Sequence, residues 1–227
     1  MKRFGDFLLN TPAAAAAAGV LSPGDAMTLV GVRGRAMAAA AAVTPTGMSA
    51  VVGGDPDEVS ETIAAHGLTA ANVNGGGQVV AAGTLDQLTA LAEAPPAKAR
   101  VIPLQVAGAF HTEHMAPAVA EVRSAAGSLT ASAPRATLLS NADGAAVTSG
   151  EDALERIVAQ VARPVRWDLC CRTMLDLGVT AAVELAPAGV LAGLARRTLP
   201  GVQTLALKSP DQIDAARELV REHGGAR

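Results

Sequence analysis

In this 227-residue sequence, the neighbours of two side chains make them candidates for a catalytic or binding role, and His111 is the first. It lies in the stretch V-A-G-A-F-H-T-E-H-M, where small and apolar residues typical of a strand give way to a helix start. A helix N-terminus disfavours the imidazolium form, so we expect a neutral imidazole that can accept a proton. His66 and His223 instead precede glycine at helix ends, where a histidine has an ordinary structural role. His111 is therefore the candidate base.

Arg33 is the second such residue. On the helix expected from residue 23 it shares a face with apolar neighbours, namely Leu29, Val30 and Met37. A cation on such a face needs an anion or a route to solvent, and three interpretations stay open. Arg33 forms a structural ion pair with a carboxylate such as Glu184, extends to the surface, or clamps the carboxylate of a substrate.

Composition excludes several classes of function. Half of the residues are hydrophobic and the formal net charge is −3, so neither disorder nor general nucleic-acid binding is indicated. Cys170 and Cys171 are adjacent, which suits neither a disulfide framework nor a metal site, and no dinucleotide fingerprint is present. No apolar run reaches the ~20 residues that span a bilayer. We expect a soluble, cytoplasmic protein with no bound metal or redox cofactor.

Four helix starts have a side chain suited to capping. In three of them the residue three positions after the cap is Glu or Gln, as a capping box requires. These stretches are Asp55-Pro56-Asp57-Glu58, Thr84-Leu85-Asp86-Gln87 and Ser209-Pro210-Asp211-Gln212, and Ser22-Pro23 is a weaker fourth start for a helix to about Val43.

The order of predicted elements from 48 to 106 indicates a small domain. The order is β-α-β-β-α-β, with expected bounds of 48–52, 55–66, 69–73, 78–82, 84–93 and 100–106. The glycines of Asn74-Gly75-Gly76-Gly77 suit a tight hairpin between the two middle strands better than a phosphate-binding loop, because no helix follows directly. A ferredoxin-like domain over 47–106 is the prediction.

The remaining chain predicts a larger α/β domain formed by 1–46 and 107–227. After His111, helices from 113, 151, 167, 189 and 209 alternate with strands at 136–140, 181–185 and 202–207. Alternation of this kind favours a mainly parallel sheet. The small domain is then an insertion in the large one.

Several separated stretches resemble, in order, one enzyme family. They are DAMTLVGVRGRAMAAAA, TGMSAVVGG, NVNGGGQVVAAG, GAFHTEHMAPAV, LLSNADG, RPVRWD and VELAPAGVLAGLARR. The family is that of the malonyl-CoA:acyl-carrier-protein transacylases of fatty acid synthesis, with the related acyltransferase domains of polyketide synthases. The resemblance covers about residues 13–208 and implies an α/β-hydrolase-like large domain with a ferredoxin-like insertion.

The resemblance also implies roles for individual residues. In the family, a serine within G-H-S-x-G attacks the malonyl thioester and passes the acyl group to the phosphopantetheine thiol of a carrier protein. His111 matches the general base, which a backbone carbonyl orients, and Arg33 matches the arginine that binds the free malonyl carboxylate. Phe110 matches a position associated with malonyl rather than methylmalonyl units, and Met37 and Asn74 match pocket positions. The implied substrate is malonyl-CoA, and the implied partner is acyl carrier protein.

The sequence departs from the family pattern at the nucleophile. Neither a P-G-Q-G-x-Q loop nor a G-H-S-x-G elbow is present, and counting back from Ala18 places Leu8 at the expected serine. The stretch Gly47-Met48-Ser49-Ala50-Val51 lacks the second glycine. One hypothesis is an N-terminally truncated transacylase, inactive as given and with an incomplete large domain.

The alternative hypothesis is a non-catalytic remnant that still binds malonyl groups or a carrier protein. Carrier proteins are typically acidic, so five arginines are candidate contacts: Arg163, Arg166, Arg172, Arg196 and Arg197. Under either hypothesis we expect marginal stability, with 48–106 the best-folded part and Arg3–Leu9 able to supply one replacement strand.

Overall fold

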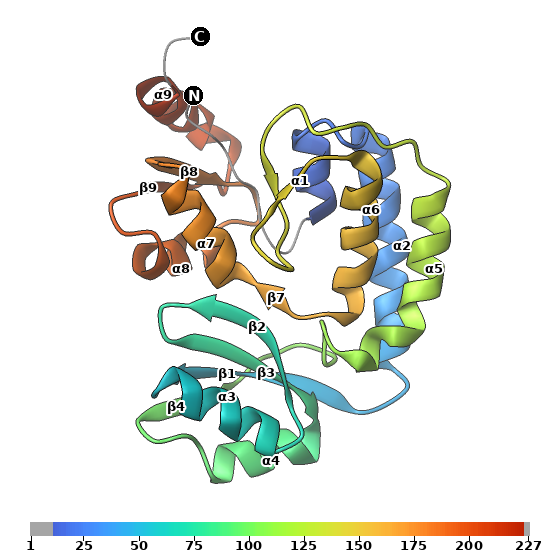
Figure 1. The fold of residues 1–227 in the computed structure, drawn as a ribbon, viewed down its shortest axis with the longest axis vertical. Helices are drawn as coiled ribbons and strands as arrows, with labels where there is room; N and C mark the ends of the chain where they lie inside the picture. Colours follow the sequence, from blue (N-terminus) through green and yellow to red (C-terminus); the bar gives the residue numbers. More distant parts are fainter. Residues whose placement is uncertain (1–10, 225–227) are drawn as a thin grey trace.

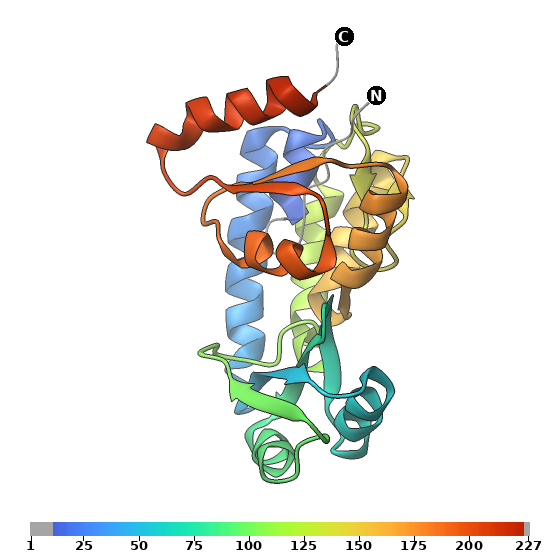
Figure 2. The same ribbon diagram turned by 90° about the vertical axis from the view of Figure 1, so that its left-hand side faces the viewer.

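The computed structural model describes residues 11–224, which form a mixed α/β structure around a five-stranded sheet (Figure 1). The expectations for Arg3–Leu9 and for Leu8 at the nucleophile position lie outside the described residues. Helices α1, α2, α5 and α6 lie together on one side of the molecule, and the long helix α2 leads down to the sheet (Figures 1 and 2). None of the described helices is both long and apolar enough to cross a membrane.

The segment predicted as β-α-β-β-α-β has that element order. Its bounds are β1 Thr46–Gly53, α3 Pro56–Ala65, β2 Thr69–Gly75, β3 Gln78–Thr84, α4 Leu85–Glu93 and β4 Ala99–Pro103. The sheet order is β4-β1-β3-β2-β7, and all neighbours are antiparallel except β2 and β7. The fifth strand, β7 (Val165–Arg166), was not predicted, and it joins Asn72 and Val73 from a distant part of the sequence.

Alternation along the strands gives this sheet two packed faces. On the face covered by α3 and α4, Val51 and Ala81 pack with the helix residues Ile63 and Leu91. On the other face, the cluster of buried residues contacts Phe110 and consists of Met48, Ala71, Val80, Ala82 and Ala109. Phe110 therefore lies against the face of the sheet that looks toward the rest of the chain.

Three of the four predicted caps are present. Thr84 forms a complete capping box with Gln87, Asp55 accepts from the backbone N–H groups of Asp57 and Glu58, and Ser22 accepts from that of Asp25. The Ser209 prediction is wrong, since its side chain caps nothing. There the Gln212 side chain accepts from the backbone N–H of Lys208, and a 3-10 turn precedes the helix.

A group of helices forms a second core beside the sheet (Figures 1 and 2). It comprises α1 Thr11–Ala17, α2 Pro23–Ala41, the 3-10 turn η1 Glu113–Met115, α5 Ala116–Gly127, α6 Gly150–Ala159 and the 3-10 turn η2 Gln160–Ala162. Small alanines let these helices approach closely, and the fully buried side chains between them include Leu29, Met115, Val122 and Ile157. This core is continuous with Phe110, so these helices and the sheet meet at that ring.

The prediction of a mainly parallel sheet in the larger part is wrong for the described residues. Strand β5 (Leu138–Leu139) pairs antiparallel with β6 (Ala146–Val147), because the turn at Asp143 and Gly144 reverses the chain. Gly144 has a φ of 72°, which suits glycine. The predicted strands at 181–185 and 202–207 do form a parallel pair, β8 (Ala181–Glu184) with β9 (Gln203–Ala206), and β7 pairs in parallel with β2 of the five-stranded sheet.

The C-terminal helices pack on these short strands. They are α7 Trp167–Asp176, α8 Val190–Thr198, the 3-10 turn η3 Pro210–Gln212 and α9 Ile213–His223. A core with Trp167, Cys170 and Leu194 joins α7 to α8, whereas α9 buries only Leu219. Beneath α9 lies an apolar cavity of about 680 Å³, bordered by β8 and the end of α7. The last helix is therefore weakly attached.

Candidate functional site

His111 lies in a tight loop between β4 and η1, directly before Thr112, the N-cap of η1. Its φ is 63°, a left-handed conformation that is costly for a residue other than glycine. Two buried threonines hold this loop: Thr46 Oγ1 accepts from the backbone N–H of Ala109 at 3.0 Å, and Thr112 Oγ1 donates to the Ala109 carbonyl at 2.6 Å. The surrounding hydrogen bonds therefore fix the unusual backbone of His111.

The imidazole of His111 is buried and has one defined partner. Its Nδ1 lies 2.8 Å from the carbonyl oxygen of Gln160. Because a carbonyl can only accept, Nδ1 carries the hydrogen and Nε2 has the free lone pair. The pKa of His111 is lowered to about 4: burial is the largest cause, the hydrogen bond to the Gln160 carbonyl opposes it, and the charge of Arg33 adds to it.

The neutral imidazole expected from the sequence is thus present, but the expected cause is wrong. Burial and a neighbouring guanidinium lower the pKa, not a helix N-terminus. Among the hydrogen bonds of residues 11–224, none involves Nε2 of His111. This atom is available as a proton acceptor at neutral pH.

Arg33 projects from the middle of α2 into the same site. Its Nη2 donates to Oε1 of Gln160 at 3.1 Å, and its buried Nε has no hydrogen-bond partner. Burial lowers its pKa, and no carboxylate within residues 11–224 forms an ion pair with it. Arg33 is half-buried and its Nε is buried, so the guanidinium does not lie free at the surface.

The suggested ion pair between Arg33 and Glu184 is also wrong. The Glu184 carboxylate caps the start of α8, where its two oxygens accept from the backbone N–H groups of Gly189, Leu191 and Ala192. Within the part of the chain that the structure describes, Arg33 is therefore a half-buried cation without a counter-ion. Such a group has a strong preference for an anionic ligand.

Gln160 is the residue that sequence reasoning missed. It is 4% exposed, its main-chain carbonyl binds His111 and its side chain binds Arg33. The available signal was an amide inside the apolar run R-I-V-A-Q-V-A, where a polar side chain must find a buried partner. Gln160 joins the candidate base to the candidate cation.

The other predicted residues divide into two groups. Met37 is buried one turn beyond Arg33, in the helical core against which Phe110 packs, and Phe110 directly precedes His111 in the chain. Asn74 is buried on β2, where its Nδ2 donates to Oε1 of Gln78 at 3.0 Å. No hydrogen bond links Asn74 to His111, Arg33 or Gln160 in the described residues.

The chemistry of the site is that of a base beside an anion subsite. A neutral imidazole with a free Nε2 lies next to a half-buried guanidinium, as acyl transfer with an acidic acyl group requires. No group of three or more possible metal ligands occurs among residues 11–224. Burial also raises the pKa of Cys171 to about 11, so its thiol is a poor nucleophile at neutral pH.

Fold and site together are those of an α/β acyltransferase, and the chain belongs to the acyl transferase domain family, which matches residues 11–217. Its relatives in that family are malonyl CoA-acyl carrier protein transacylases. The Mycolicibacterium smegmatis protein of that name is 53% identical over 211 residues, covering 91% of this chain and 73% of the relative. The Escherichia coli K12 protein is 32% identical over 209 residues, covering 89% and 67%.

Solved structures show the same likeness. The crystal structure of MCAT from Mycobacterium tuberculosis superposes with a TM-score of 0.90 at 50% identity, covering 94% of this chain and 70% of that one. A malonyl-transacylase in complex with a type II polyketide acyl-carrier protein has a TM-score of 0.86 at 25% identity, covering 96% and 72%.

Proposed function

We propose that this chain takes part in the transfer of a malonyl group from coenzyme A to acyl carrier protein in fatty acid synthesis. The observation that carries the proposal is the link through Gln160 between a neutral, proton-accepting His111 and a half-buried Arg33 that has no counter-ion among residues 11–224. The names of the relatives at 53% and 32% identity support it. Malonyl-CoA is the substrate in this proposal, with no bound cofactor.

Each side chain then has one task. Arg33 binds the free carboxylate of the malonyl group. In relatives that contain the G-H-S-x-G serine, the histidine matched by His111 accepts the proton of the serine hydroxyl as its oxygen attacks the thioester carbonyl, and this 227-residue sequence has no serine in such a motif. In such relatives the carbon–sulfur bond then breaks, and the imidazolium returns the proton to the departing sulfur. Transfer onward repeats these steps with the phosphopantetheine thiol as the incoming group.

No serine of the 227 residues stands in a G-x-S-x-G elbow. We therefore propose that the chain as given binds malonyl groups without forming the acyl ester. Intact mass measurement after exposure to malonyl-CoA should show no added mass. An ester adduct on the chain would contradict this proposal.

Malonate binding tests the anion subsite directly. Arg33→Gln should weaken binding by about 1.5–3 kcal/mol, roughly 10- to 150-fold, because charged hydrogen bonds are lost. The matched control is Arg35→Gln, which removes an exposed guanidinium from the next part of α2. Calorimetric titration that detects no malonate binding to the unsubstituted chain would contradict the proposal, as would equal effects of the two substitutions.

Phe110 is proposed to limit the acyl group to malonyl. Its ring packs against both the helical core and the cluster on the sheet, so it has little room to move for a branching methyl group. Methylmalonate should bind more weakly than malonate to the unsubstituted chain, and Phe110→Ser should narrow the difference. Asn74 stays a proposed pocket residue, and Met37 is proposed to line the pocket from α2.

Carrier-protein docking is proposed at the exposed arginines. Arg163, Arg172, Arg196 and Arg197 are exposed and form no ion pair within residues 11–224. Arg166 is a weaker candidate, because it already binds Asp168 at 2.7 Å. Binding to an acidic carrier protein should weaken with salt and with substitution of the two adjacent arginines of α8 by Gln.

We also propose a division of the chain into two domains. Residues 47–106 form a ferredoxin-like small domain, which the sheet order β4-β1-β3-β2 supports. Residues 1–46 and 107–227 form the larger, α/β-hydrolase-like domain. Hydrogen exchange that shows the two parts opening in a single step would contradict the division.

A further inference from the structure

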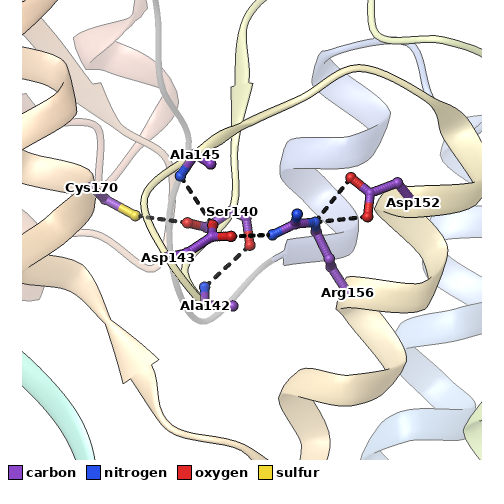
Figure 3. Close-up of polar contacts among 7 residues, drawn as sticks. All are labelled: Ser140, Ala142, Asp143, Ala145, Asp152, Arg156 and Cys170. Atoms are coloured by element: carbon purple, nitrogen blue, oxygen red, sulfur yellow. Dashed lines mark hydrogen bonds and ion pairs between the residues drawn. The ribbon is translucent and has the colours of Figure 1, made fainter.

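Helix α6 is held on one side by a single arginine with two carboxylate partners. Nε of Arg156 donates to both carboxylate oxygens of Asp152, at 2.8 and 2.9 Å, and its Nη1 donates to Asp143 Oδ2 at 2.8 Å (Figure 3). Asp152 is one turn earlier on the same helix, whereas Asp143 belongs to the turn between β5 and β6. The contact with Asp143 therefore links α6 to another element.

The turn that carries Asp143 is itself fixed from several directions. Asp143 Oδ1 accepts from the backbone N–H of Ala145 at 3.0 Å, and Cys170 Sγ donates to the carbonyl of Ser140 at 3.3 Å (Figure 3). The backbone N–H of Arg166, in β7, donates to the Asn141 carbonyl at 2.7 Å. This turn is thus attached to α7 and to the five-stranded sheet, and it gives α6 a firm support.

Arg156 is directly connected to the site through the main chain. The backbone N–H of Gln160 ends the helix by donating to the carbonyl of Arg156. The next carbonyl in this path, that of Gln160, accepts from His111, and the Gln160 side chain accepts from Arg33. A displacement of the last turn of α6 would therefore move the partner of both site residues.

We propose that Arg156 is a positioning residue, which through Asp143 sets the place of Gln160 and so the tautomer and orientation of His111. The geometry of the imidazole follows from observed contacts alone, whereas the effect on malonyl binding rests on the proposed function. Arg156 touches neither His111 nor Arg33 and has no catalytic role of its own.

The same helix offers a matched control. Glu155, the preceding residue, forms an ion pair with Arg123 of α5, and both side chains are more than half exposed. That pair also ties α6 to a neighbour, but its two hydrogen bonds join only Arg123 and Glu155 and do not lead to Gln160. Loss of a surface pair of this kind has little effect on stability.

Nitrogen NMR of the His111 imidazole in the whole 227-residue chain tests the proposal. The unsubstituted chain should hold its hydrogen on Nδ1 with slow solvent exchange. Arg156→Gln should accelerate this exchange at least about tenfold and mix the two tautomers, because the carbonyl partner moves. Arg156→Lys, which retains the charge but not the paired contacts, should give an intermediate result, and Glu155→Gln should match the unsubstituted chain.

Two outcomes would overturn the proposal. One is an Arg156→Gln chain with a lower melting temperature but an unchanged His111 tautomer and exchange rate, measured where it is fully folded. The other is an equal change in Glu155→Gln, which would indicate general loosening of α6. Should Arg156→Gln not fold, Asp143→Asn removes the charge from the inter-element contact, while its amide oxygen can still accept from Ala145, and it carries the same expectations.

Malonate affinity separates this proposal from the proposed function. Arg156→Gln should weaken malonate binding several-fold through misplaced Gln160, with Glu155→Gln unchanged. If the unsubstituted chain binds no malonate, the proposed function fails, while the imidazole measurements still decide the role of Arg156.

Discussion

Acidification should destabilise the chain through His111. Its pKa is about 4 in the folded chain, where burial has the largest effect, against 6.5 for an ordinary imidazole. As pH falls, the unfolded chain therefore takes up a proton first, which favours unfolding. The contribution of neutral His111 to the free energy of unfolding is complete above pH 6.5 and is lost as pH falls toward 4. The difference between the two pKa values corresponds to about 3 kcal/mol, with a slope of up to about 1.4 kcal/mol per pH unit.

The comparison that isolates this effect is with His111→Asn. Asparagine tolerates a left-handed backbone and does not titrate, so the variant retains the loop conformation without the proton uptake. Urea unfolding followed by the fluorescence of the single buried tryptophan, Trp167, gives the free energy of unfolding from pH 4.5 to 7.5. The unsubstituted chain should lose stability faster than the variant across this range.

The control is His66→Asn, which retains His111 and should therefore keep the steep pH dependence. Carboxylates that titrate in the same range are common to all three chains and cancel in the comparison. Between pH 6.5 and 4.5 the free energy of unfolding should fall further for the unsubstituted chain than for His111→Asn. If the two falls agree within about 0.5 kcal/mol, the reasoning is refuted.

Three further predictions concern stability. Thr84→Ala removes a complete capping box and should cost about 1 kcal/mol in urea unfolding, whereas an unchanged midpoint would contradict the role of the cap. Leu91→Ala empties a fully buried position and should cost about 2–5 kcal/mol, compared with a much smaller effect of Leu85→Ala, which is 51% exposed. In native-state hydrogen exchange, α9 should open first, because it buries only Leu219 above an apolar cavity; protection equal to that of β1 and β3 would contradict this.

Local chemistry explains which parts of the fold could be predicted. A cap such as Thr84 with Gln87 depends on residues three apart, and the glycines of the β2–β3 hairpin act on their own backbone, so both are visible in sequence. Strand β7 and the antiparallel β5–β6 pair escaped prediction. They are two residues long each, which is too short for a periodic signal.

The sequence could indicate candidate residues one by one but not their arrangement. His111 and Arg33 stand out by their apolar surroundings, yet the residue that joins them is 49 positions from one and 127 from the other. The low pKa of His111 comes from burial and from Arg33, which are properties of packing rather than of spacing. Sequence reasoning therefore gave the correct protonation state for the wrong reason.

A fragment ending at residue 106 would lack β7, the strand at one edge of the five-stranded sheet. Because β7 supplies the outermost strand of the five-stranded sheet, such a fragment would expose the backbone of Asn72 and Val73 along an open edge. Unpaired edges of this kind recruit strands from other molecules. Excising the six-element unit for separate study would thus favour self-association, unless a charged residue or a proline is placed on β2 to block the edge.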